Sequence, residues 1–105
     1  MKVDALIIIK NEQGTATHHV VADFFEHQDP GSRFKSMNGR FKIEPSTDFA
    51  GLLNASFATG KYIILQFFFE DGEKFAQALI KRIQPMSGEV GYLISGPLAP
   101  CATFL

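Results

Sequence analysis

Three side chains that could bind a metal ion recur at intervals of four residues in the first third of the sequence. They are His19, Asp23 and His27. On a helix, residues four apart lie on one face, so all three could act as ligands. On a strand, His19 and His27 would be roughly 27 Å apart at about 3.4 Å per residue, too far to share an ion. The hypothesis therefore depends on local structure, and we expect no metal and no other cofactor.

A second candidate site is a basic segment between residues 33 and 43 that contains no acidic residue. It holds four of the ten basic residues of the chain: Arg33, Lys35, Arg40 and Lys42. A two-stranded ribbon with one cationic face can contact phosphates, which makes polyanion binding one hypothesis. Lysines on an edge strand also deter sheet-to-sheet association, which is the alternative explanation. The net charge of −1 argues against nucleic acid as the partner.

Signatures of catalysis are missing from the sequence. It has no Gly-x-Ser-x-Gly elbow, no phosphate loop and no dinucleotide-binding glycine pattern. The single cysteine, Cys101, lies among small apolar residues, and we expect it to be buried and inert. Glu70, Asp71 and Glu73 cluster where a helix is expected to begin, a position that favours acids electrostatically. A non-enzymatic protein is therefore favoured over an enzyme.

Composition predicts one globular domain covering residues 1–105. Hydrophobic residues make up 46% and charged residues 20% of the chain, so a core can form without disulfides. One cysteine excludes an intrachain disulfide and fits a reducing compartment. The sequence shows neither a signal peptide nor an apolar run of about 20 residues. These features predict a cytoplasmic protein that does not enter membranes.

The N-terminal elements that would position the histidines can be interpreted in two ways. Residues 3–10 predict a strand, and Asn11–Gly14 predicts a tight turn into a second strand over 15–22, followed by a helical turn at 23–27. Alternatively, the spacing of Val20, Val21, Phe24 and Phe25 fits a helix. That alternative would give a ferredoxin-like βαββαβ order.

The basic segment predicts a hairpin, because Asn38-Gly39 lies between alternating residues. Beyond it, we expect a helix over 46–60 that begins at Ser46 or Thr47 and ends at Gly60. A strand over 61–69 follows, then a helix over 71–83 and a last strand over 90–95. The rival interpretation of Asp71-Gly72 as a hairpin turn is less favoured because it sets Glu70 against Glu73.

Together these elements predict an α+β fold. We expect a mostly antiparallel sheet of five or six strands with two helices packed on one face. The strand 61–69 would present Ile63, Leu65, Phe67 and Phe69 to the helices and Tyr62, Ile64, Gln66 and Phe68 to the other side.

The second face of that sheet also needs a cover, because the first strand is apolar on both sides. A partner subunit could supply it, or the uncharged C-terminal tail that ends in Phe104 and Leu105. We therefore expect a small interaction protein that acts through association, as a homodimer and with a protein partner. The alternative is a small-molecule-binding protein or small enzyme whose pocket, between the sheet and its cover, uses Tyr62, Gln66 and the histidines.

Overall fold

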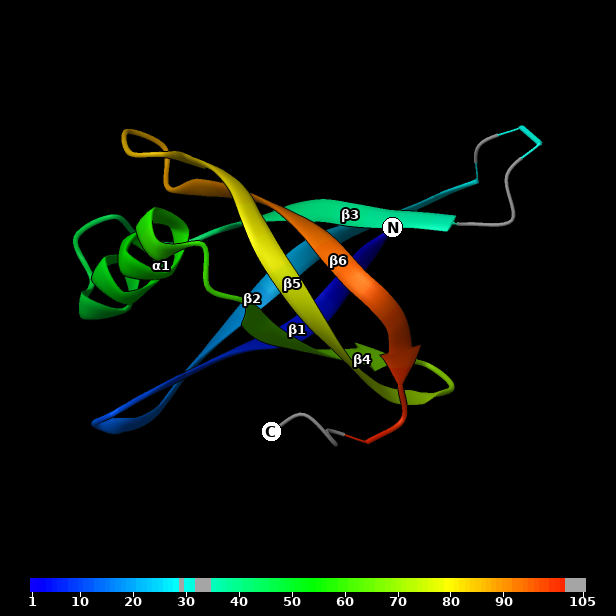
Figure 1. The fold of residues 1–105 in the computed structure, drawn as a ribbon, viewed down its shortest axis with the longest axis horizontal. Coiled ribbons are helices and arrows are strands. Elements are labelled where there is room, and N and C mark those ends of the chain that lie inside the picture. Colours follow the sequence, from blue (N-terminus) through cyan, green and yellow to red (C-terminus); the bar gives the residue numbers. More distant parts are fainter. Residues whose placement is uncertain (29, 32–34, 102–105) are drawn as a thin grey trace.

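The described residues form six strands and one helix (Figure 1). The computed structural model describes residues 1–28, 30–31 and 35–101. The elements, in chain order, are β1 (Lys2–Asn11), β2 (Gly14–Gln28), β3 (Lys35–Lys42), α1 (Asp48–Thr59), β4 (Ile63–Phe69), β5 (Gly72–Gln84) and β6 (Glu89–Ala99).

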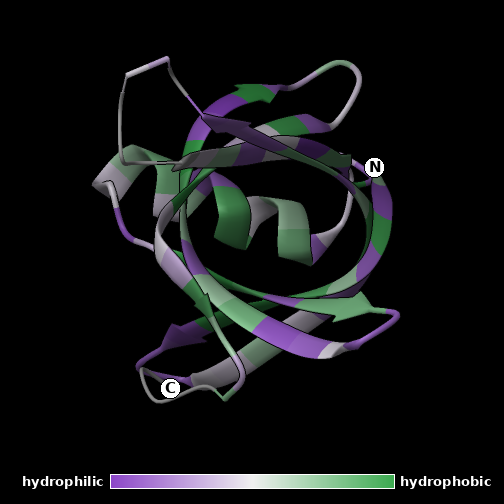
Figure 2. Ribbon diagram, turned by 90° about the vertical axis from the view of Figure 1, so that its right-hand side faces the viewer, coloured by the Kyte–Doolittle hydropathy of each residue, from purple (hydrophilic) through white to green (hydrophobic). Residues whose placement is uncertain are grey.

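The six strands close into a barrel in the order β1-β2-β3-β6-β5-β4, and every neighbouring pair is antiparallel. Seen end on, the strands form a ring and α1 lies across its far end (Figure 2). The predicted α+β sheet with two helices on one face is therefore wrong, and so is the ferredoxin-like alternative. A sheet that closes on itself buries its inner face without a layer of helices, so one helix at the end is enough.

The largest error of the sequence prediction concerns residues 71–83, which form strand β5 and not a helix. Inside the barrel, Ala76, Ala78 and Ile80 alternate with outward residues and are buried. The rival interpretation, a hairpin at Asp71-Gly72, correctly predicts that two antiparallel strands meet here. The register differs from a two-residue Asp71-Gly72 turn, because Phe68 faces Glu73 and Phe69 faces Gly72. Glu70 lies in the turn and does not oppose Glu73, so the like-charge objection to the hairpin does not apply.

The predicted hairpin over 33–43 is also wrong, because β3 runs through Asn38-Gly39 without turning. A Cβ atom on Gly39 would overlap the backbone oxygen of Asp23 and the hydroxyl group of Tyr92. Gly39 therefore allows a close approach inside the barrel and does not serve a turn. Tertiary packing overrides the local turn signal at this position.

β2 confirms the strand prediction for 15–22 and extends it to Gln28, which makes the helical alternative and the helical turn at 23–27 wrong. Its first part pairs with β1 and its last part with β3, and Asp23 pairs with both neighbours. The turn before it is as predicted: Asn11 faces Gly14, whose φ is 131°, and Asn11 Oδ1 accepts a hydrogen bond from the Gln13 backbone at 2.9 Å.

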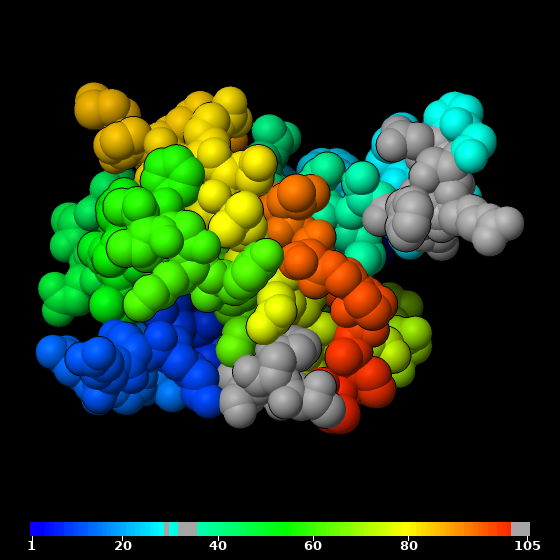
Figure 3. Space-filling view, in the orientation of Figure 1, coloured from blue at the N-terminus to red at the C-terminus, as the bar shows by residue number. Residues whose placement is uncertain are grey.

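α1 confirms the predicted helix and both of its ends. The Ala50 backbone N–H donates to Thr47 Oγ1 at 3.3 Å, and Gly60 ends the helix in the left-handed region at φ 65°. Phe49 and Leu53 are buried, whereas Phe57 is exposed. On the surface, α1 packs beside β5 (Figure 3). In the described part of the chain, no helix combines the length and apolar character needed to cross a membrane.

β4 supplies the centre of the core, and the predicted division of its two faces is confirmed. Ile63, Leu65 and Phe67 are each 0% exposed, whereas the outward Tyr62 and Phe68 are 53% and 39% exposed. The Phe67 ring lies 5.3 Å from that of Phe24, 5.6 Å from Phe69 and 6.4 Å from Tyr92, measured between ring centres. Side chains therefore fill the barrel, as expected for so few strands.

Tyr92 connects the core to the outer surface near Asp23. Its side chain is buried, and its hydroxyl group donates a hydrogen bond to the Asp23 backbone oxygen at 2.7 Å. Burial, and secondarily the nearby Asp23 charge, raises the pKa of Tyr92 well above its ordinary value. The neutral phenol thus ties β6 to β2.

This raised pKa predicts a loss of stability in alkali. Above about pH 10 the unfolded chain releases the Tyr92 proton while the folded chain keeps it, so the free energy of unfolding falls by about 1.4 kcal/mol per pH unit. Tyr92→Phe should lower stability at pH 7 by about 1 kcal/mol through the lost hydrogen bond and should flatten the alkaline slope. Urea unfolding from pH 7 to 11 measures both effects. An equal slope in the two proteins would contradict the assignment.

Candidate anion-binding groove on the barrel surface

Two arginines flank a glycine on the outer face of three neighbouring strands. Arg40 of β3 faces Gly91 of β6, and Gly91 also faces Arg82 of β5. Directly opposed residues on adjacent strands point to the same side of a sheet. Because Gly91 has no side chain, a space is open directly over its backbone, and the Glu89 carboxylate bridges the two guanidinium groups beside it.

A β-bulge adds a third cation beside this space. The register between β5 and β6 shifts between Ile80, which faces Tyr92, and Arg82, which faces Gly91. Lys81 is the extra residue, so Lys81 and Arg82 together oppose Gly91, and both are exposed. Bulges commonly reorient side chains next to binding sites.

The resulting groove has a volume of about 400 Å³ and is here called the arginine groove. It is lined by Asn38, Gly39, Lys81, Arg82, Gly91, Tyr92 and Leu93. A second groove of about 260 Å³ contains Arg40 and extends past β2. Its lining is Lys2, Val21, Asp23, Arg40, Phe41, Lys42 and Glu89. Arg40 therefore lines the second groove and faces Gly91, which lines the arginine groove.

Two carboxylates form ion pairs with the arginines. Glu89 Oε1 lies 3.9 Å from Arg40 Nη1 and 3.9 Å from Arg82 Nη2, and Arg40 Nε donates to Asp23 Oδ2 at 3.4 Å. Arg40 and Arg82 remain 54% and 65% exposed. Each guanidinium group has five N–H donors, and these contacts leave several of them directed to solvent.

The charge of this surface differs from that of the whole chain. The two grooves together contain five cationic side chains and two carboxylates, a formal charge of +3. The whole chain carries −1, so the rest of the molecule carries −4. Such an asymmetry produces a local positive potential that the overall charge conceals.

Only part of the predicted basic site can be located in the structure. Arg40 and Lys42 lie in the second groove. Lys35 begins β3, but its side chain lies outside the described part of the structure, as does the whole of Arg33. Phe104 and Leu105 lie outside the described residues too. Only two of the four predicted cations can therefore be assigned to the groove surface.

Other predicted site residues are dispersed over the barrel. Tyr62, directly before β4, is exposed, and on the outer face of β4 Gln66 Nε2 donates to Glu73 Oε2 at 3.1 Å. His19 Nε2 lies 3.5 Å from Asp4 Oδ1 on the neighbouring strand. β2 is extended from His19 through Asp23 to His27, so these residues do not converge on one ion. No group of three metal-binding side chains occurs among the described residues.

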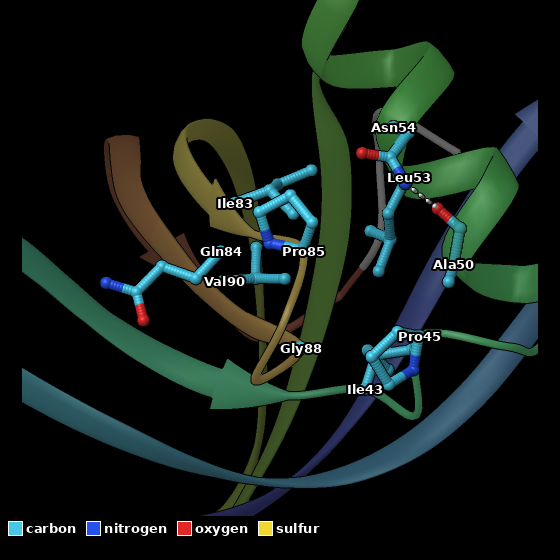
Figure 4. A pocket seen from close by; sticks show the side chains of 10 residues that line it. All are labelled: Ile43, Pro45, Ala50, Leu53, Asn54, Ile83, Gln84, Pro85, Gly88 and Val90. Atoms are coloured by element: carbon cyan, nitrogen blue, oxygen red, sulfur yellow. Dashed lines mark hydrogen bonds between the residues drawn. The ribbon is translucent and has the colours of Figure 1, made fainter.

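A smaller pocket lies between α1 and the turn that joins β5 to β6 (Figure 4). It encloses about 100 Å³ and is mostly apolar, with Asn54 and Gln84 as its polar side chains. Ligand pockets usually measure about 300–1,000 Å³, so this one admits at most a small apolar group. Tyr62, Gln66 and the histidines do not line it. Cys101, expected to be buried, is exposed.

Sequence reasoning missed Lys81, Arg82 and Gly91. Lys81 and Arg82 fall within the predicted helix over 71–83, which gives no reason to place them beside Arg40. A glycine inside a strand often marks a bulge or the close approach of a ligand. Gly91 lies inside the predicted strand over 90–95 and is such a glycine. The chain has no significant match to a protein-family model, a curated protein or a solved structure.

Proposed function

We propose that this protein is a small binding module that takes a phosphate-bearing anion in the arginine groove. The observation that carries the proposal is the bulge at Lys81, which sets Lys81 and Arg82 opposite Gly91, with Arg40 on the other side. Guanidinium groups bind phosphate through paired N–H donors, and the missing side chain of Gly91 leaves room for the anion.

An ordinary surface network of ion pairs is the competing explanation. Exposed pairs contribute about 0–1 kcal/mol, so the contacts to Glu89 and Asp23 add little stability. They place a carboxylate beside each guanidinium group before a ligand arrives. An incoming phosphate could compete with such weak pairs at small cost, and the local charge of +3 favours its approach.

Filling the groove should abolish binding without harming the fold. A Cβ atom on Gly91 would meet its nearest neighbours, Arg82 Cβ and Gly39 O, at 3.9 and 4.0 Å, which is ordinary contact. Gly91→Val should therefore fold normally, since β-branched residues suit strands, while occupying the space for the anion. We expect wild type to bind inorganic pyrophosphate at low ionic strength, measured by isothermal titration calorimetry, and Gly91→Val to bind at least about 10-fold more weakly.

Removing the cations tests the same prediction from the other direction. Arg40→Gln and Arg82→Gln should each weaken pyrophosphate binding by about 10- to 100-fold, because each removes a charged hydrogen-bonding group. Lys61→Gln is the matched control, since Lys61 is exposed and lies outside both grooves. Equal losses in all three variants would indicate unspecific charge attraction and would overturn the proposal.

Association through an apolar outer face stays a prediction. Its strongest apolar pair, Ile8 of β1 opposite Ile64 of β4, is already 7% and 8% exposed within the single chain. That pair therefore offers little surface to a second subunit. The arginine groove, by contrast, is open, so anion binding is the function that the described residues favour.

A further inference from the structure

We infer that the anion is a nucleotide, whose base stacks on Phe25 while its phosphates occupy the arginine groove. This inference rests on the proposed function and adds the class of ligand. It starts from Phe25, an exposed aromatic side chain on β2 at 46% exposure. The preceding residue, Phe24, is buried inside the barrel, so Phe25 must point outward.

Strand pairing places Phe25 next to the groove. Phe25 faces Asn38 of β3, and Asn38 is one of the groove residues. Arg40 lies two residues further along β3 on the same face, which makes it the diagonal neighbour of Phe25. Diagonal neighbours are about 7–8 Å apart and within reach of aromatic and long side chains. An aromatic surface and a guanidinium group thus lie side by side.

Two successive rows of side chains on this surface differ in character. The first row consists of Phe25, Asn38, Leu93 and Leu79, three apolar residues and one amide. The second row, two residues further along β2, β3 and β6 and three along the bulged β5, contains Asp23, Arg40, Gly91 and Arg82. A ligand that matches both rows needs a planar, weakly polar end and an anionic end. A nucleotide has these two ends.

The dimensions of the surface agree with this assignment. Phe25 and Gly91 are separated by two strand spacings of about 4.8 Å across the sheet and by about 7 Å along a strand. The direct distance between them is therefore roughly 12 Å. An extended nucleoside diphosphate covers a comparable span from its base to its terminal phosphate. Asn38, between the two ends, has both a donor and an acceptor for the edge of the base or for the sugar.

A single nucleotide fits this surface better than a nucleic acid strand. Asp23 and Glu89 interrupt the cations on either side of Arg40, and they would repel the successive phosphates of a long backbone. Binding of single strands also relies on several stacking aromatics along a cationic path. Among the described residues, Phe25 is an exposed aromatic side chain that the pairing sets beside the arginine groove, whereas Tyr92 is buried.

The experiment compares ADP with inorganic pyrophosphate by calorimetry on the full chain. We expect wild type to bind ADP about 10-fold more tightly than pyrophosphate, because base stacking adds to phosphate binding. Phe25→Ala should reduce ADP affinity to the pyrophosphate level and leave pyrophosphate affinity unchanged. Phe57→Ala removes an aromatic side chain of similar exposure on α1 and should change neither affinity.

A fluorescent variant tests the stacking contact directly. The chain contains no tryptophan, so Phe25→Trp provides a single reporter at the proposed site. Its emission should be quenched by ADP and not by pyrophosphate.

The outcomes separate the two claims. Equal wild-type affinities for ADP and pyrophosphate would overturn the nucleotide assignment and leave the arginine groove intact. No binding of either ligand would overturn both. A short single-stranded oligonucleotide that binds more tightly than ADP would replace the nucleotide assignment with nucleic acid.

Discussion

Phe67→Ala is expected to lower the free energy of unfolding by about 3–5 kcal/mol, the largest effect predicted for any single substitution here. Phe67 is 0% exposed and touches the rings of Phe24, Phe69 and Tyr92 at the centre of the barrel. Truncating it removes the buried ring and leaves a cavity that the surrounding strands cannot fill without bending. Urea denaturation followed by far-ultraviolet circular dichroism measures the loss.

The neighbouring residue provides the control for this prediction. Phe68 has the same side chain one position later, but it points outward and is 39% exposed. Phe68→Ala should therefore cost far less than Phe67→Ala. A shift of one residue in the register of β4 would exchange the two side chains. A larger loss for Phe68→Ala would show that the described register is wrong.

Gly39→Ala is expected to destabilise the protein by about 3 kcal/mol, although it adds only one methyl group. That methyl group would overlap the Asp23 backbone oxygen and the Tyr92 hydroxyl group, and a backbone atom cannot turn aside as a flexible side chain can. β2 and β3 would have to separate, and the hydrogen bond from Tyr92 to Asp23 would be strained. Thermal and urea unfolding at neutral pH measure the effect.

Gly91→Ala is the matched substitution on the adjacent strand. Its added methyl group points outward and finds its nearest neighbour at 3.9 Å, so stability should change by less than about 0.5 kcal/mol. The contrast between these two glycines tests the packing of the barrel wall itself. Similar losses of stability for Gly39→Ala and Gly91→Ala would mean that Tyr92 and the Asp23 backbone do not approach Gly39 closely.

Local sequence signals were sufficient where short-range chemistry decides the structure. Thr47 and Gly60 mark the two ends of α1, and Asn11–Gly14 marks the first turn, each through contacts within a few residues. The alternation of β4 between its two faces was also predictable, since Ile63, Leu65 and Phe67 on one side are fully buried and Phe69 is partly buried. These elements depend little on the topology of the sheet.

The remaining elements depend on contacts between distant residues, which the sequence does not display. Phe75, Leu79 and Ile83 have helical spacing, yet β5 is a strand because β4 and β6 pair with it on both sides. Asn38-Gly39 resembles a turn, yet Tyr92, more than fifty residues later, decides its conformation. Without the position of β6, neither segment could be assigned correctly.

The candidate site follows the same rule. Arg40 and Lys42 were recognised from charge alone, whereas Arg82 joins Arg40 only because β6 lies between β3 and β5. The bulge at Lys81 is a property of strand pairing and has no local sequence signature. The interior glycine Gly91 was the one feature of the groove that the sequence could have revealed.

The central claim is that the space over Gly91 binds phosphate, and titration of the isotope-labelled protein with inorganic pyrophosphate, followed by NMR, tests it most directly. At low ionic strength, the largest and saturable shifts should occur at the backbone amides of Lys81, Arg82 and Gly91. Gly91→Val should lose these shifts and keep a folded spectrum. Shifts centred on Lys61 or Lys74, or no shift at millimolar pyrophosphate, would contradict the claim.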